Sequence, residues 1–397
     1  MGNSADSPWL TIIGINEDGL AGLSIASRKA LDAAAVVFGG SRHLALADLK
    51  DRGRPWPVPF DIAPVLAEKG RSVVVLASGD PFWFGAGSPI VQHLDASEWV
   101  AHPAPSTFSL IASRLGWRLE DVACLGLHAA PFERLVPILT PGKRIICLVR
   151  DAEAVHLLCS WLQKHGWGET AITALSAVGG PNERTVYVTA TSGFPTTITA
   201  PVAVALEPIG GRGLGRASGL ADDLFAHDGQ ITKRPIRALA LSALAPRPGE
   251  HLWDIGAGSG SISVEWALTG GSATAIEQNP ARAENILTNV ERFGLAHRIA
   301  IVATAAPIGL KNLPRPDAVF FGGGLNNDSF EALWSLIPTG ARLVAHAVSL
   351  ETQALVSELH GRLGGDLDRF EISHAQPLGR MRSWQPTRPI VQWTCVR

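Results

Sequence analysis

Short apolar runs alternate with stretches of helical spacing along the first half of the chain. Residues 10–15 (LTIIGI) and 73–77 (VVVLA) have the continuous apolar character of buried strands, and residues 20–37 carry apolar side chains at helical spacing. Further strands are predicted over 144–149, 171–174 and 202–206, with a helix over 154–164. This alternation indicates a mostly parallel sheet with crossover helices.

A glycine-rich stretch interrupts this pattern after residue 208. Residues 209–219 (IGGRGLGRASG) contain five glycines and no hydrophobic period, which predicts a linker. Beyond it the alternation restarts, with helices predicted over 234–244, 261–268 and 280–293 and strands over 251–255, 273–277, 299–303, 317–321 and 342–347. We therefore expect an α/β protein with one domain over 1–208, a linker over 209–219 and a second domain over 220–397.

Composition narrows the class of protein. The chain has 397 residues, 46% of them hydrophobic, and a formal net charge of −2, which argues against binding to a nucleic-acid backbone. The four cysteines, Cys124, Cys147, Cys159 and Cys395, are widely separated, so neither a disulfide framework nor a metal site is predicted. No signal segment and no apolar run of about 20 residues is evident. We expect a cytoplasmic protein that does not bind membranes.

A nucleotide-binding loop follows the first strand of the second domain. In D254-I-G-A-G-S-G-S261 the glycines Gly256, Gly258 and Gly260 allow a tight turn and close approach to a ligand at a helix N-terminus. Asp254 suits a ligand with a cationic amino-acid portion better than a pyrophosphate, because like charges repel. Glu277 ends the next strand, where a carboxylate can accept both hydroxyls of a ribose. These features favour S-adenosylmethionine over the alternative, a nicotinamide cofactor.

The second domain resembles a known family over residues 218–397. The segment Q230-I-T-K-R-P-I-R-A-L-A-L-S242, the Asp254 loop, F321-G-G-G324 and A347-V-S-L-E-T352 are similar, in order and spacing, to the decarboxylating precorrin methyltransferases of cobalamin biosynthesis. The resemblance implies a Rossmann-like class I methyltransferase fold, with Thr232, Gly322 and Gly323 beside the cofactor. His346 stands where many relatives have Asn, and its role is left open.

The first domain resembles a different family over residues 8–208. Its opening strand with Gly14, the S78-G-D-P-F-W-F-G85 segment, H102-P-A-P-S-T107 and the late strand ending A205-L-E207 look like the tetrapyrrole methylase family. Asn16 departs from that pattern, because a glycine is expected there. The resemblance implies two α/β subdomains with S-adenosylmethionine in the cleft between them. The residues that it places at this cofactor are Gly14, Gly79, Asp80, Pro81, Ser106 and Leu206.

Together the two resemblances imply one chain with two S-adenosylmethionine sites, one per domain. Its expected activity is methylation of the tetrapyrrole precorrin-6Y at carbons 5 and 15 with loss of carbon dioxide from the ring C acetate, and its expected state is a homo-oligomer. Cationic partners for the substrate carboxylates are predicted at Lys233, Arg234, Arg237, Arg380 and Arg382. No catalytic residue is assigned. The alternatives are a methyltransferase for another substrate, including nucleic acid, a nicotinamide-dependent oxidoreductase, and a non-catalytic binding module.

Overall fold

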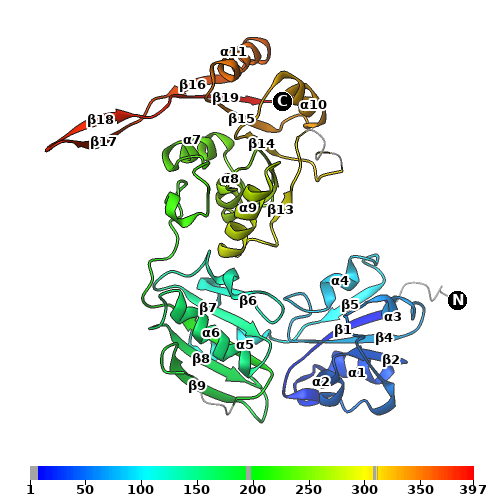
Figure 1. The fold of residues 1–397 in the computed structure, drawn as a ribbon. Helices are drawn as coiled ribbons and strands as arrows, with labels where there is room; N and C mark the ends of the chain where they lie inside the picture. The colour runs from blue at the N-terminus through cyan, green and yellow to red at the C-terminus, as the bar shows by residue number, and fades with distance from the viewer. Residues whose placement is uncertain (1–7, 194–197, 307–309, 311) are drawn as a thin grey trace. The chain divides into compact units, whose positions relative to one another are not determined.

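The chain forms two compact units in a computed structural model that describes residues 8–193, 198–306, 310 and 312–397. Unit 1 comprises Met1–Ala130 and Thr140–Arg212, and unit 2 comprises Pro131–Leu139 and Gly213–Arg397 (Figure 1). The boundary between Arg212 and Gly213 falls within the stretch 209–219, in which no helix or strand forms. The domain limits drawn from the sequence remain a prediction.

The first sheet of unit 1 is entirely parallel. Its strands are β1 (Leu10–Ile15), β2 (Val36–Gly39), β3 (Gly53–Pro55), β4 (Val73–Ser78) and β5 (Trp99–His102), in the order β3-β2-β4-β1-β5. The helices of this part are α1 (Ile25–Ala33), α2 (Ser41–Leu46), α3 (Ala63–Leu66) and α4 (Gly87–Val91). Alternate strand residues enter separate cores on the two faces, with Ile13 on one and Ile12 on the other.

The single helix predicted over 20–37 is wrong. The structure has a short 3-10 helix (Gly19–Gly22), then α1, and then the strand β2. Helix α1 begins after Ser24, whose Oγ accepts a hydrogen bond from the Ser27 N–H at 3.0 Å. The run Val36-Val37-Phe38 is β-branched and aromatic, and it pairs with β4 as a buried strand.

The second sheet of unit 1 corrects the expectation of a mostly parallel arrangement. Its strands are β6 (Val122–Gly126), β7 (Arg144–Val149), β8 (Ala171–Ser176), β9 (Arg184–Thr189) and β10 (Val202–Glu207), in the order β6-β7-β10-β8-β9. Only β6 and β7 pair in parallel, and the other three pairings are antiparallel. Helices α5 (Thr107–Leu115) and α6 (Ala152–Lys164) accompany this sheet. A local apolar run predicts a strand but carries no information about its direction.

Unit 2 is built on one seven-stranded sheet with the order β13-β12-β11-β14-β15-β19-β16. The strands are β11 (His251–Ile255), β12 (Ser272–Ile276), β13 (Ile299–Val302), β14 (Ala318–Phe321), β15 (Arg342–Ala347), β16 (Asp366–Phe370) and β19 (Ile390–Val396). The helices are α7 (Arg234–Leu244), α8 (Ser261–Leu268), α9 (Pro280–Arg292), α10 (Asn327–Leu336) and α11 (Leu350–Leu363). The five strands from β13 to β15 are parallel, β19 runs antiparallel to β15, and β16 runs antiparallel to β19.

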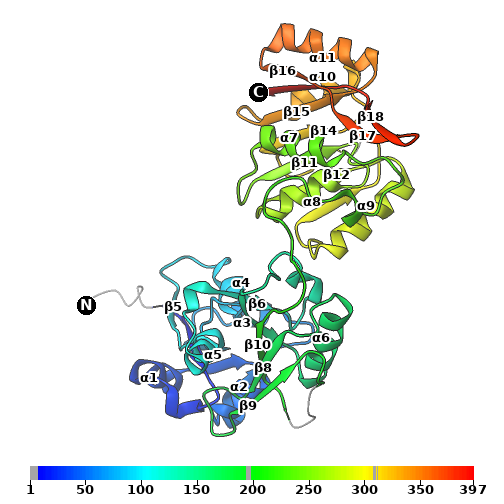
Figure 2. The same ribbon diagram turned by 90° about the vertical axis from the view of Figure 1, so that its left-hand side faces the viewer.

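Helices cover both faces of this sheet. Leu252 and Phe320 pack into a core with residues of α7, α8 and α9, whereas Trp253 and Phe321 pack into a second core with residues of α10 and α11. Figure 2 draws α10 and α11 beside β15 and β16, and α8 and α9 beside β12 toward the other end of the strand order. The carboxyl ends of the parallel strands therefore meet at one edge, where doubly wound sheets bind their ligands.

A hairpin of strands β17 (Ser373–Leu378) and β18 (Met381–Pro386) forms a separate two-stranded sheet. All residues of both strands are exposed, and Figure 1 draws the hairpin as a ribbon that extends from β16 and β19. Among the described residues, none of the helices combines the length and the apolar character that a membrane crossing requires.

Candidate functional site

A cavity of about 380 Å³ lies at the carboxyl ends of β11, β12, β14 and β15 in unit 2. Several of the residues predicted at a cofactor or substrate lie on its wall, namely Thr232, Lys233, Gly256, Gly258, Glu277, Gly322 and Gly323. His346 also lines the cavity, with Nε2 at 2.9 Å from Gln392 Oε1, and burial lowers its pKa. Asp254 and Gly260 do not contribute to the wall.

Glycine is required where the ends of β11 and β14 approach each other. Gly256 has a φ of +67°, and a Cβ there would lie 2.8 Å from the Gly323 carbonyl oxygen. A Cβ on Gly322 would in turn lie 2.9 Å from the Gly256 carbonyl oxygen. Gly260 has a φ of +69° at the start of α8, and a Cβ there would lie 2.8 Å from the Ile286 side chain. The loop can therefore be built only with glycines at these positions.

The carboxyl group of Asp254 is buried behind this loop. Its Oδ2 accepts hydrogen bonds from the Ser263 N–H at 3.2 Å and from the Ser263 hydroxyl at 2.6 Å. Its Oδ1 is buried and finds no hydrogen-bond partner within the part of the chain that the structure describes. Burial raises the pKa of Asp254 to about 6, and the negative charge of Glu277 adds to the rise. An orphaned carboxylate oxygen is the kind of group that a cationic ligand can satisfy.

Glu277, at the end of β12, accepts hydrogen bonds from the same loop and from the residues that follow it. Its Oε2 accepts a hydrogen bond from the Gly258 N–H at 2.9 Å, and its Oε1 accepts one from the Asn279 N–H at 2.9 Å. The side chain is buried yet lines the cavity. Because a carboxylate oxygen can accept more than one hydrogen bond, each oxygen keeps capacity for a ligand hydroxyl. The Glu277 carboxylate and a loop of glycines thus meet at the cavity, and the Asp254 carboxyl group lies behind the loop.

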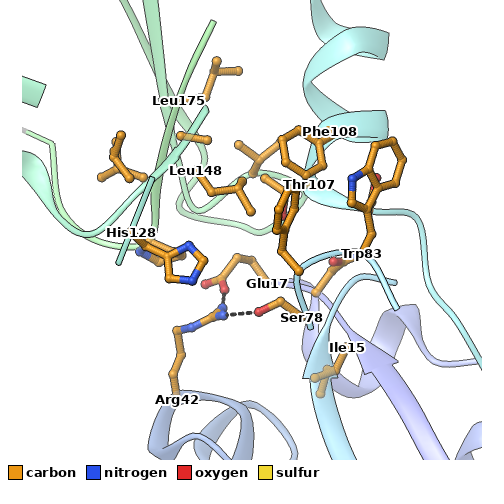
Figure 3. A pocket seen from close by; sticks show the side chains of 18 residues that line it. Ile15, Glu17, Arg42, Ser78, Trp83, Thr107, Phe108, His128, Leu148 and Leu175 are labelled. Atoms are coloured by element: carbon orange, nitrogen blue, oxygen red, sulfur yellow. Dashed lines mark hydrogen bonds and ion pairs between the residues drawn. The ribbon is translucent and has the colours of Figure 1, made fainter. Parts of the chain in front are cut away.

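Unit 1 contains a second cavity, of about 320 Å³, between its two sheets. Figure 3 shows an apolar part formed by Phe108, Leu148 and Leu175 and a polar part in which Arg42 reaches Glu17 and Ser78. Among the residues predicted at a cofactor in this unit, Ser106 lines the cavity. Its Oγ also accepts a hydrogen bond from the Ser109 N–H at 3.1 Å and so caps α5.

The other residues predicted at the cofactor in unit 1 lie in the packing around the strand ends. A Cβ on Gly14 would lie 1.8 Å from the Gly79 carbonyl oxygen, and Gly79 itself has a φ of +57°. Asp80 caps the following turn, since its Oδ1 accepts a hydrogen bond from the Phe82 N–H at 2.9 Å. Pro81 is buried in that turn, and Leu206 is buried in the middle strand of the second sheet. Gly14, Gly79, Asp80, Pro81 and Leu206 do not line the unit 1 cavity of about 320 Å³.

Comparison with known proteins covers both units. The family described as precorrin methyltransferase domain matches residues 223–397, and the tetrapyrrole (corrin/porphyrin) methylases match residues 10–192. A Sinorhizobium protein named precorrin-6Y C(5,15)-methyltransferase [decarboxylating] is 43% identical over 402 residues, which cover 98% of this chain and 97% of that protein. The chain belongs to the decarboxylating precorrin-6Y C(5,15)-methyltransferase family. It is therefore a methyltransferase, and S-adenosylmethionine is the methyl donor that this family implies.

Shorter relatives and solved structures match about half of the chain. A Salmonella typhi protein named cobalt-precorrin-6B C(15)-methyltransferase (decarboxylating) is 34% identical over 187 residues, which cover 45% of this chain and 96% of that protein. The crystal structure of the C-terminal domain of precorrin-6Y C5,15-methyltransferase from Rhodobacter capsulatus is 51% identical, with a TM-score of 0.46, and covers 46% of this chain and 100% of that one.

The cations predicted to meet a substrate of this methyltransferase family have different surroundings. Lys233 lines the unit 2 cavity, and Arg234 is exposed beside it at the start of α7. Arg380 and Arg382 lie on the exposed β17–β18 hairpin and do not line the cavity.

Arg237 is a correction to the predicted set of substrate cations. Its side chain is 0% exposed, and its guanidinium is paired with Glu265 and Asp222. The structure therefore contradicts its place among the cations that face the substrate. A helical pattern cannot tell a cation on a solvated face from one that is buried against acidic partners.

The sequence pattern did not predict a polar cluster that the structure places at the unit 1 cavity of this methyltransferase. Arg42 forms an ion pair with Glu17 and donates a hydrogen bond to Ser78 Oγ at 2.9 Å. His43 Nε2 lies 2.8 Å from the same oxygen. Burial, with a further contribution from the Arg42 charge, lowers the pKa of His43 to about 4, so the imidazole is neutral at physiological pH. The one sequence feature that pointed to this cluster is that Ser78 ends a buried strand. Glu17, Arg42 and His43 are far from Ser78 in sequence, so no motif joins them to it.

Proposed function

We propose that this chain methylates precorrin-6Y at carbons 5 and 15 and removes carbon dioxide from its ring C acetate, giving precorrin-8X in cobalamin biosynthesis. The observation that carries this proposal is the match to the Sinorhizobium relative over 98% of the chain at 43% identity, since both units are included in it. The two cavities, one in each unit, support two separate binding sites for S-adenosylmethionine.

The two reactions are proposed to be divided between the units. The Salmonella relative, whose name gives only carbon 15 methylation and decarboxylation, matches 187 residues, about the length of one unit. The family described as precorrin methyltransferase domain matches residues 223–397, which lie in unit 2. Unit 2 therefore methylates carbon 15 and decarboxylates the acetate, and unit 1 methylates carbon 5.

The residues of the unit 2 cavity have the chemistry that a methyl transfer of this kind needs. When bound, S-adenosylmethionine supplies an electrophilic methyl group. Glu277 offers acceptor oxygens to the ribose hydroxyls, Gly256 and Gly258 let the ligand approach the backbone, and Asp254 contributes negative charge. Lys233 offers a cation to a substrate carboxylate at the cavity wall.

No strong base is needed at either cavity. A pyrrole-derived carbon in an enamine-like system is already nucleophilic, so the protein's main work is to align the acceptor carbon with the methyl group and to exclude water. In unit 1 the apolar wall of Phe108, Leu148 and Leu175 excludes water from one side of the cavity. Arg42 on the opposite side offers a cation toward substrate carboxylates.

A second copy of this chain is proposed to cover the β17–β18 hairpin. Leu378, Met381 and Trp384 are 65%, 77% and 72% exposed on it. A two-stranded ribbon is marginally stable in water on its own, and apolar side chains of this size gain most when another surface covers them. The edges of the hairpin are also free to pair with a strand, which makes the hairpin of another copy a suitable partner.

Mass analysis of precorrin-6Y incubated with S-adenosylmethionine and the full chain tests the proposed activity. Two methyl additions and one loss of carbon dioxide are expected. An unchanged substrate mass, with a folded chain and an active methyl donor, would overturn the proposal. S-adenosylhomocysteine binding, measured in parallel by calorimetry, is expected to show two events per chain.

A further inference from the structure

A segment of unit 2 leads from the linker to the wall of the unit 2 cavity without forming long regular structure. We call residues 219–233 the strap. Between its ends it contains one 3-10 helix, Asp222–Leu224, and it stops where α7 begins. Three side chains from three successive helices, all buried, hold it in place: Arg237 of α7, Glu265 of α8 and Asn289 of α9.

Arg237 and Glu265 bind the first half of the strap. Glu265 accepts hydrogen bonds from the N–H groups of Gly219 at 2.6 Å and Leu220 at 2.9 Å, and from Arg237 Nε at 2.6 Å. Arg237 Nη1 contacts Asp222 Oδ1 at 3.0 Å, and its Nη2 donates to the Leu220 carbonyl. The guanidinium carbon also lies 4.8 Å from the centre of the Phe225 ring.

Asn289 joins the strap to the glycine loop. Its Oδ1 accepts a hydrogen bond from the Ala226 N–H at 2.7 Å, and its Nδ2 donates to the Ala226 carbonyl at 2.9 Å. The same Nδ2 donates a second hydrogen bond, of 2.8 Å, to the carbonyl of Ser259, which lies between Gly258 and Gly260. One buried amide therefore fixes the distance between two segments that are 33 residues apart.

The last residues of the strap form part of the cavity wall. Gln230, Ile231, Thr232 and Lys233 all line it, and a Cβ on Gly258 would lie 3.3 Å from the Gln230 carbonyl oxygen. Arg237 reaches this end too, since Nη1 donates a hydrogen bond of 2.5 Å to the Thr232 carbonyl. The strap thus lies against the glycine loop. The buried side chains of Arg237 and Asn289 hydrogen bond to backbone carbonyls at Thr232 of the strap and at Ser259 of the glycine loop.

We infer that Arg237 and Asn289 are positioning residues for the unit 2 cofactor, which set the strap and the glycine loop at the separation that S-adenosylmethionine requires. The inference rests on the proposed function. Neither side chain lines the cavity, so both act through the backbone at Thr232 and Ser259. Because such a wall is already ordered before the ligand binds, less conformational entropy is lost on binding.

The test compares R237K and N289S in the full chain with R342K as a matched control. Arg342 is also largely buried in unit 2, binds a carbonyl (Leu244) and both oxygens of a carboxylate (Glu250), and lies at the amino end of β15. R237K and R342K lose hydrogen bonds of the same kinds, to backbone carbonyls and to carboxylates, and both keep the positive charge. Calorimetric titration with S-adenosylhomocysteine and cofactor kinetics for carbon 15 methylation are measured for each.

R237K and N289S are expected to weaken one of the two binding events about tenfold and to leave the other unchanged. The KM for S-adenosylmethionine in carbon 15 methylation rises by the same factor, whereas kcat at saturating cofactor stays within about threefold. Amide exchange quickens at Gly219, Leu220 and Ala226. R342K lowers the melting temperature without changing either binding event.

Two results would overturn the inference while leaving the proposed function intact. One is wild-type affinity at both sites in R237K and N289S, and the other is equal weakening of the same event in R342K, which would assign the effect to general stability. A wild-type chain that bound no S-adenosylhomocysteine would overturn the proposed function, and the inference with it.

Discussion

At Asp254 the needs of folding and of ligand binding oppose each other. The carboxyl group is buried, only one of its oxygens is hydrogen bonded within the described residues, and its pKa is raised to about 6. A raised pKa means that the folded chain holds the proton more tightly than the unfolded chain. The stability that this gives is complete below about pH 3.8, the ordinary value, and is lost as the pH rises through about 6.

We expect D254N to stabilise unit 2 at pH 8 while impairing its cofactor site. The neutral amide removes the cost of a buried charge, so the melting temperature of unit 2 rises by about 5 °C at pH 8 and by progressively less toward pH 4. S-adenosylhomocysteine binding at one site weakens at least about tenfold, because the negative charge behind the glycine loop, which favours a ligand with a cationic portion, is removed. Calorimetry at several pH values checks both effects. A melting temperature unaffected by the substitution at every pH would contradict the expected stabilisation.

Gly14 provides a steric prediction in unit 1. A Cβ at this position would lie 1.8 Å from the Gly79 carbonyl oxygen and 2.5 Å from the Ala104 nitrogen, so G14A must displace backbone and costs roughly 3 kcal/mol or more. Gly116 has a φ of +64° with no neighbour within 4 Å of the added Cβ, so G116A costs only about 1 kcal/mol of backbone strain. Urea unfolding read by hydrogen exchange in β1 measures both, and equal costs would refute the steric argument.

At the residue scale, the glycines of the unit 2 loop stand where the backbone geometry requires glycine. Gly256, Gly258 and Glu277 lie together because strand ends in a parallel sheet share one edge, and their role at a cofactor stays a prediction. Arg237 and Asn289 could not be predicted in their roles, because their partners are backbone groups of the strap, whose path is not encoded by any periodicity. The same limit applies to Arg42 and Glu17 in unit 1.

At the scale of elements, prediction succeeded where the apolar pattern is strong. Helix α7 and strand β11 have the predicted bounds, since α7 carries a buried apolar stripe and β11 buries the apolar residues Leu252, Trp253 and Ile255. The region 20–37 failed because its apolar spacing is compatible with a helix, whereas the Ser24 cap and the pairing of β2 with β4 divide it. The direction of the strands in the second sheet of unit 1 depends on tertiary pairing, so it cannot be predicted from the local pattern of apolar residues.

The β17–β18 hairpin gives a prediction about assembly. Replacing two exposed apolar side chains with charge, in M381E/W384E, is expected to reduce the molar mass measured by light scattering to that of a smaller assembly, because the covering surface loses its apolar contact. S383E/Q385E adds the same charge on the same exposed strand without removing apolar area, and it should keep the wild-type mass. A wild-type chain that is monomeric at assay concentration would contradict the proposed self-association.

At the scale of the whole molecule, the two units should give separable products. In the full chain, D254N is expected to leave methylation at carbon 5 and to reduce the loss of carbon dioxide at limiting cofactor, whereas G14A reduces carbon 5 methylation and leaves decarboxylation in place. Mass analysis of the tetrapyrrole with labelled methyl donor separates these outcomes. Carbon dioxide released by D254N at the wild-type rate would contradict the assignment of decarboxylation to unit 2.

The strap has a practical meaning for anyone who wishes to prepare unit 2 alone. A fragment cut at residue 223, where the family match begins, would lack Gly219, Leu220 and Asp222. Glu265 would then lose two amide donors, and the buried Arg237 would lose one of its two acidic partners, which is costly inside a protein. An expression boundary at or before Gly213 retains every one of these contacts.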